Sequence, residues 1–220
     1  SSAASDVYKR QFLNSQANNP NINSDITIVV SSKFCYTTSR AFLTGTKNWT
    51  ITDNGLSSDC NNFTSTWLLS NGVFELPLKD YSNITIDWGD NSTSTHTDGA
   101  FPAHTYSALN DNQTVTITVT VNDAEKDIGE IYMNGDHPSS TLIRTITKWG
   151  EGKWESFYSA FNGATNLTIP ATDEPDLSLT TSMELAFTSC TSLVGTTLND
   201  WDVSTINNMR NMFQNATAFN

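Results

Sequence analysis

A 26-residue repeat within residues 157–219 constrains the fold of this chain more than any other feature. Three segments align without gaps, and each places a phenylalanine at the same position: Phe161, Phe187 and Phe213. The aligned segments also share a large apolar residue four positions before this phenylalanine, a small residue three positions after it, and then a threonine. This agreement predicts a stack of similar units, because a single unit of such length cannot bury its own apolar face.

The repeat predicts the local structure of each unit. Phe157 and Phe161 are four positions apart, which places both side chains on one face of a short helix. A second track, 176–178 matching 202–204, reads Asp-Leu-Ser and Asp-Val-Ser and predicts a short extended piece whose middle residue points inward. One strand-like piece and one helical turn per repeat is typical of a leucine-rich solenoid, with repeats of about 20–29 residues. Cys190 occupies the small-residue column, which favours a buried hydrophobe over a catalytic or metal-binding thiol.

Residues 198–220 carry a family resemblance. Trp201-Asp-Val-Ser204, followed by Met209, Met212-Phe213 and a final Phe219-Asn220, resembles the BspA-type leucine-rich repeat of bacterial surface proteins. The second repeat departs from this pattern because Pro175 takes the place of the tryptophan. In the first repeat, Trp149 matches but Glu151 stands where Leu177 and Val203 stand. The resemblance implies repeats over residues 146–220, with the first as a divergent junction to the preceding segment.

Residues 63–145 follow a period of two instead. Thr114 to Val121 alternates threonine with Val or Ile, which predicts a strand with one buried face. Ile86-Asp-Trp-Gly-Asp90, followed by His104-Thr-Tyr106, is similar to the PKD family of immunoglobulin-like extracellular modules, with Asn91 in place of the usual glycine. The resemblance implies a small β-sandwich. The expected fold class is β-rich with short helices: an Ig/PKD-like β-sandwich followed by a leucine-rich-type α/β solenoid.

The segment before the strand-rich region, positions 1 to 62, is expected to contribute little to either module. Residues 1–11 resemble the translation of a sequencing-library adapter, so they are left out of fold reasoning, and the chain is expected to be a window of a longer protein read from environmental DNA. Residues 12–62 are expected to be a linker and the tail of a preceding repeat module, because 39–43 and 48–55 resemble the closing unit of another leucine-rich array. Cys35 and Cys60 could form a disulfide with each other, or either could pair outside this chain.

The charge balance excludes two classes of partner. The chain has 11 Lys and Arg against 23 Asp and Glu, a net charge of -12. This acidity repels phosphate backbones and anionic lipid heads, so we expect no nucleic acid partner and no binding to a membrane surface. No apolar run reaches the roughly 18 residues that a membrane span needs, so no membrane insertion is expected.

No group of residues has the pattern of a chemical site. Asp87 and Asp90 lie at the end of a strand and the start of a turn, so we expect them to form the turn rather than an acid/base pair. Together with Asp98 they lack the regular ligand ladder of a calcium loop. The three histidines lack metal-ligand spacing: His96, His104 and His137. No catalytic, cofactor-binding or metal-binding residue is predicted, no cofactor is expected, and no particular binding residue is singled out.

These observations predict a non-enzymatic protein that binds through its repeats. We expect a cell-surface or secreted adhesion and display protein, extracellular in location, with an unidentified protein or glycan of a host, matrix or neighbouring cell as its partner. The alternative is an accessory region, a spacer or a carbohydrate- or protein-binding part, of a larger secreted hydrolase whose catalytic domain lies elsewhere.

Overall fold

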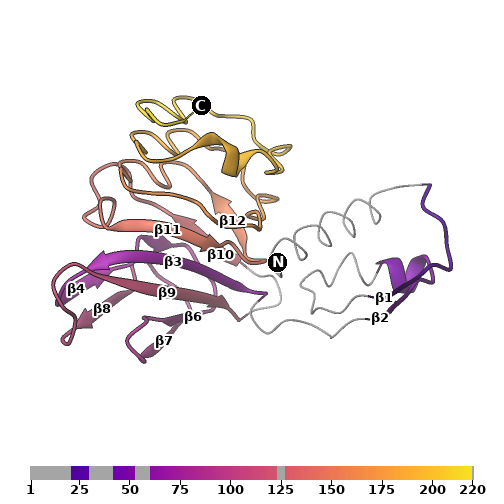
Figure 1. Ribbon diagram of the computed structural model, residues 1–220, viewed down its shortest axis with the longest axis horizontal. Helices are drawn as coiled ribbons and strands as arrows, with labels where there is room; N and C mark the ends of the chain where they lie inside the picture. Colours follow the sequence, from indigo (N-terminus) through magenta and orange to yellow (C-terminus); the bar gives the residue numbers. More distant parts are fainter. Residues whose placement is uncertain (1–20, 30–41, 53–59, 123–126, 220) are drawn as a thin grey trace. The chain divides into compact units, whose positions relative to one another are not determined.

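The computed structural model describes residues 21–29, 42–52, 60–122 and 127–219. The chain divides into two compact units, residues 1–60 and 61–220, which are taken one at a time (Figure 1). The adapter-like residues 1–11 and Cys35 lie outside the described residues.

The first unit contains a short parallel strand pair, β1 (Thr27–Val29) and β2 (Thr50–Thr52), and one turn of π-helix, η1 (Phe42–Thr46). Its small core is formed by Ile22, Leu43 and Trp49, and the Trp49 indole N–H donates to the Asn23 carbonyl at 2.8 Å. Of the predicted closing unit, residues 39–41 and 53–55 lie outside the described residues. Cys60 is disulfide-bonded, whereas the partner predicted for it falls in the part that is not described.

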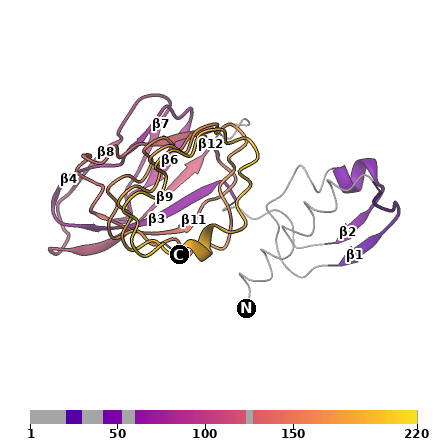
Figure 2. The same cartoon turned by 90° about the horizontal axis from the view of Figure 1, so that it is seen from above.

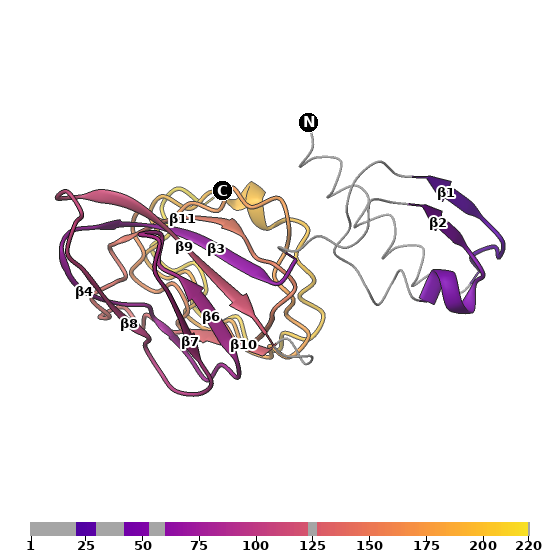
Figure 3. The same ribbon diagram turned by 90° about the horizontal axis from the view of Figure 1, so that it is seen from below.

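The second unit is rich in strands, as predicted from the sequence (Figure 3). In chain order these are β3 (Asn62–Leu69), β4 (Gly72–Glu75), β5 (Leu78–Lys79), β6 (Ile84–Asp87), β7 (Thr93–His96), β8 (Ala103–Tyr106), β9 (Gln113–Val121), β10 (Asp127–Ile131), β11 (Ile143–Lys148) and β12 (Lys153–Ser156). They form a five-stranded sheet in the order β11-β3-β9-β6-β7, a three-stranded sheet β12-β10-β5, and the pair β4-β8. A 3-10 helix, η2 (Gly195–Leu198), lies further along the chain.

The period-two pattern of β9 is confirmed. Val115, Ile117, Val119 and Val121 are at most 3% exposed, and the threonines between them lie on the other face. β3 alternates in the same way, and its buried Trp67 packs on Phe74 of β4, with ring centroids 5.1 Å apart. The buried face of the five-stranded sheet therefore contributes to one apolar core that extends into the repeats.

The repeats form coils that stack directly on one another (Figure 2). In each inner coil, backbone N–H groups on alternate residues donate to carbonyls of the following coil. The first set is 157→182, 159→184, 161→186 and 163→188, and the second is 183→208, 185→210, 187→212 and 189→214, at 2.7–3.3 Å. The phenylalanine column is continuous, because the Phe161 and Phe187 rings stack at 5.4 Å and the Phe187 and Phe213 rings at 5.7 Å, both with 7° between the planes.

The short helix predicted from Phe157 to Phe161 is wrong. In a helix the Phe161 N–H would donate to the Phe157 carbonyl, but here it donates to Ala186 of the next coil at 2.8 Å. Backbone φ is positive at Ser159, Leu185 and Asn211, which also prevents helix formation. The coils are therefore built from consecutive turns, in which side chains four positions apart still face the same core.

The two edges of the strand-rich region continue into the coils. β11 pairs antiparallel with β3 and makes a parallel bridge from Thr145 to Thr168. β10 pairs antiparallel with β5 and parallel with β12, in a register that matches Asp127 with Lys153 and Glu130 with Ser156. In each of these two pairs, the paired residues are one full repeat, 26 positions, apart in the sequence. The repeat spacing thus begins at β10, before the position where the sequence pattern becomes visible.

Candidate functional site

Four polar residues lie at or beside the turn between β6 and β7: Asp87, Asp90, Ser92 and His104. The Asp87 carboxylate accepts the Gly89 N–H at 2.9 Å, and the Asp90 carboxylate accepts the Ser92 N–H at 3.0 Å. The turn-forming role predicted for both aspartates is confirmed. His104 of β8 contacts Asp90 through its Nε2 at 2.8 Å, and its ring stacks on Trp88 at 5.1 Å.

Three of these residues, Asp90, Ser92 and His104, could be taken for a nucleophilic relay, but their geometry is different. A relay requires the serine and the carboxylate on opposite nitrogens of the histidine ring. Here Asp90 and the Ser92 Oγ both approach Nε2, at 2.8 and 3.5 Å, and the Ser92 hydroxyl donates to Asp90. That hydrogen bond lowers the pKa of the Asp90 carboxyl, and the contact with His104 acts in the same direction. The network fixes the turn, and His104 does not bridge the serine and the carboxylate as it would in a relay.

Tyr106 holds this turn to the core. It is 2% exposed, and its hydroxyl donates to the Trp88 carbonyl at 2.7 Å. Burial raises the pKa of the Tyr106 phenol, so the group stays a neutral donor. We expect Tyr106→Phe to lower the free energy of unfolding by about 1–3 kcal/mol, because the buried carbonyl loses its partner. Urea unfolding followed by tryptophan fluorescence measures this, and Tyr158→Phe, with its side chain 40% exposed, should change little.

Inside the coils, Cys190 occupies the position that the repeat predicts. Its side chain is fully buried, and its thiol donates to the Phe161 carbonyl at 3.1 Å. Burial raises the pKa of this thiol to about 12.

Because the thiolate is the reactive form, we expect Cys190 to react with a disulfide reagent at least about a hundredfold more slowly than a free cysteine at pH 8. Denaturation should restore the ordinary rate. Spectrophotometric thiol titration measures both rates, and Cys190→Ala gives the background from the rest of the chain. Rapid labelling of the folded protein that disappears in Cys190→Ala would contradict this assignment.

One column of side chains runs along the outside of the stack, with Tyr158 and Arg210 exposed and Tyr132 and Glu184 half-buried. Tyr132, Tyr158, Glu184 and Arg210 stand one repeat apart on successive coils. The Tyr132 and Tyr158 rings stack at 6.3 Å with 23° between their planes, and Arg210 lies 3.8 Å from Glu184. The side chains of this column differ from coil to coil, while the buried positions beneath them repeat. We call these four residues the outer column.

Charged residues of the strand-rich region border the outer column. The Lys79 ammonium of β5 lies 4.6 Å from the centre of the Tyr132 ring and forms an ion pair with Glu130 of β10. At the other end, the Asn208 amide donates to Glu184 at 2.8 Å. The column therefore combines aromatic faces with charged and amide groups on a fixed backbone, a composition suited to recognising proteins or glycans.

Two kinds of feature are absent from the described part of the chain. Among residues 21–29, 42–52, 60–122 and 127–219, no three His, Cys, Asp or Glu side chains are grouped so that they could hold a metal ion. Within the same ranges, no helix has the length and apolarity needed to cross a membrane.

The family comparison concerns the coils. Residues 137–220 match a family described as Mycoplasma protein of unknown function, DUF285. The matched range begins shortly after β10 and includes the stacked phenylalanines. Comparison with curated proteins and with solved structures finds no match to the chain.

Sequence reasoning did not identify the outer column, because its residues share no chemical type. Only the pair Ile131-Tyr132, which stands one repeat before Phe157-Tyr158, carries a signal of the additional coil. Such a short match cannot be separated from chance without the parallel pairing of β10 with β12.

Proposed function

We propose that this chain belongs to a non-enzymatic cell-surface or secreted adhesion and display protein, and that it binds its partner through the outer column. The observation that carries the proposal is that each coil repeats its buried residues but varies the residues of the outer column. Phe161 and Phe187 are buried at equivalent positions, while the outer column presents tyrosine, glutamate and arginine on the same scaffold. A scaffold of this kind allows the exposed residues to differ without loss of the core.

The finer assignments belong to the same proposal. The BspA-type pattern of residues 198–220 lies within the matched range 137–220, which supports a leucine-rich surface repeat. The Trp88-Gly-Asp turn held by Tyr106 supports a PKD-like module ahead of it. A location outside the cell or on its surface follows from these two resemblances, and the disulfide bond of Cys60 suits an oxidising compartment.

The partner is expected to be a protein or glycan of a host, a matrix or a neighbouring cell. The net charge of -12 argues against nucleic acid. Among exposed aromatic side chains, Tyr158 is suited to act as an anchor, because tyrosine offers a large apolar face at low entropic cost.

The test is binding of the purified chain to immobilised matrix proteins, to a glycan array and to whole cells. We expect at least one specific interaction, and we expect Tyr158→Ala and Arg210→Ala each to weaken it at least about fivefold. Val73→Ala is the matched control, because Val73 is 70% exposed on β4, outside the column. Absence of binding above background, or equal loss with Val73→Ala, would reject the proposal. Binding to an insoluble polysaccharide alone would favour the accessory-region hypothesis.

A further inference from the structure

Tyr158 is the only aromatic residue among the large apolar side chains that are exposed in the described part of the chain. Its neighbour in the outer column, Tyr132, is half-buried, and the Lys79 ammonium lies 4.6 Å from the centre of the Tyr132 ring. The Tyr158 ring is therefore the aromatic face of the outer column that is open to a ligand.

The backbone beneath the outer column is held by the same hydrogen bond in three successive coils. In each coil, a side-chain oxygen accepts the backbone N–H of the column residue two positions later. The three pairs are Ser156 with Tyr158, Ser182 with Glu184, and Asn208 with Arg210, at 3.0, 3.3 and 3.1 Å. Because the main chain is already fixed, a ligand meets these side chains with little loss of backbone freedom.

The coils that follow Tyr158 supply polar groups at defined positions. Ser159 donates its N–H to the Glu184 carbonyl at 2.9 Å, so Tyr158 and Glu184 lie on adjacent coils. The Asn208 Nδ2 donates to the Glu184 Oε2 at 2.8 Å. The other carboxylate oxygen, Oε1, lies 3.8 Å from the guanidinium of Arg210, which is too long for a hydrogen bond. Since the Arg210 side chain is 76% exposed, an acceptor and planar donors are both open to a ligand beside the Tyr158 ring.

This arrangement differs from the centre of a protein–protein interface. Such a centre is apolar and depleted of charged residues. Here one exposed tyrosine is followed, on the next coils, by Glu184 and Arg210. A pyranose ring matches these groups better, because its C–H groups form an apolar face that packs on an aromatic ring. Its hydroxyl groups both donate and accept, so they can satisfy a carboxylate and a guanidinium together.

The charges beside the column indicate that the sugar is neutral. Burial raises the pKa of the Glu155 carboxyl of β12, and negative charges nearby raise it further. These charges belong to Asp127, Asp80 and Glu130. Several carboxylates therefore lie close together on the strands that lead into Tyr132 and Tyr158, in a chain whose net charge is -12. This potential repels sialylated and sulfated glycans.

We propose that the outer column binds a neutral glycan, with one pyranose ring packed on Tyr158 and its hydroxyl groups bound by Glu184 and Arg210. This inference rests on the proposed function, because it assigns the class of ligand at the same surface. The Glu184 Oε1 accepts a hydroxyl of the sugar, and the Arg210 guanidinium donates to another. Since these groups stand on successive coils, the glycan lies along the stack and contacts more than one coil.

The first test is a glycan array probed with the full chain and its variants. We expect the bound glycans to be neutral. Tyr158→Ala and Glu184→Ala should each weaken binding at least about tenfold, whereas Glu75→Ala, an exposed glutamate of β4 outside the column, should not. Glu184→Gln keeps an oxygen that accepts a hydroxyl, so it should lose less than about threefold. Added salt should change the affinity for the bound glycan less than about twofold, because no ion pair forms with a neutral ligand.

Periodate treatment of cells or matrix proteins separates this inference from the proposed function. Periodate cleaves the vicinal diols of sugar rings and leaves the polypeptide backbone intact. We expect binding that depends on Tyr158 to disappear after this treatment. Binding that depends on Tyr158 but survives periodate would identify a protein partner, which overturns the inference and leaves the proposed function standing. Binding restricted to sialylated or sulfated glycans would also overturn the inference, whereas absence of all binding would reject the proposed function itself.

Discussion

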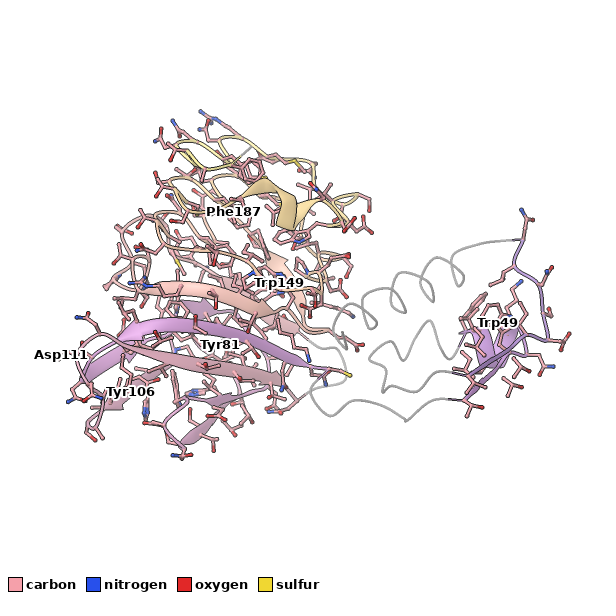
Figure 4. All side chains as sticks on the ribbon, viewed as in Figure 1. Trp49, Tyr81, Tyr106, Asp111, Trp149 and Phe187 are labelled. Carbon is pink, nitrogen blue, oxygen red and sulfur yellow. The ribbon has the colours of Figure 1, made fainter. Side chains whose placement is uncertain are left out.

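Replacing Phe187 with alanine should lower the free energy of unfolding by about 3–5 kcal/mol, the usual cost of removing a buried phenylalanine. Phe187, which is labelled in Figure 4, is fully buried in the middle coil. Its ring stacks on Phe161 and on Phe213. Trp201 packs against the same ring at 6.0 Å. The substitution leaves a cavity that both neighbouring coils border, and the turns cannot collapse into it without breaking the hydrogen bonds between coils. Urea unfolding followed by tryptophan fluorescence measures the loss.

Phe213→Ala is the matched control for this prediction. The residue type and column are the same, but Phe213 lies in the last described coil and is only partly buried. Its removal should therefore cost distinctly less than that of Phe187. Equal costs at the two positions would show that burial between coils does not determine the stability of the stack.

The sequence predicted the period of this stack but not its backbone. The phenylalanine column and the small residue at Cys190 reveal the repeat, because burial requires the same side-chain size in every coil. The local conformation was assigned incorrectly as helix, since apolar side chains four positions apart share one face in a helix and in these turns alike. What decides between the two is where the Phe161 N–H donates, and that depends on Ala186, which lies in the next coil.

More of the strand-rich region could be predicted, because its strand and turn patterns depend on residues close together in the sequence. The buried face of β9 follows directly from alternation of threonine with Val and Ile, and the turn roles of Asp87 and Asp90 follow from the residues around them. The outer column could not be predicted, because its residues differ in size and polarity from one coil to the next. The pairing of β10 with both β5 and β12 joins residues that are far apart in the sequence, and only tertiary structure brings them together.

Trp149→Ala should destabilise the strand-rich region and the coils together, by about 3–5 kcal/mol. Trp149 is fully buried and follows β11 directly. Its ring lies 5.7 Å from Phe63 of β3 and 5.3 Å from Trp201 of the third repeat. It also contacts Trp154, Phe157 and Phe161 at 5.9–6.2 Å, so one side chain connects the five-stranded sheet to several coils. Its removal should therefore weaken both parts.

Hydrogen exchange at individual amides tests this coupling. In Trp149→Ala, the amides of Ile117 in β9 and of Phe187 in the coils should both exchange faster, by similar free energies, because one cooperative unit opens as a whole. Trp149→Phe keeps a ring at this position and should produce a clearly smaller change at both sites. Faster exchange in the coils with unchanged exchange at Ile117 would mean that the two parts unfold separately. β10 and β11, the strands that join the sheets to the coils, would then act as a linker. The contacts around Trp149 predict instead that the strand-rich region holds the outer column in a fixed orientation.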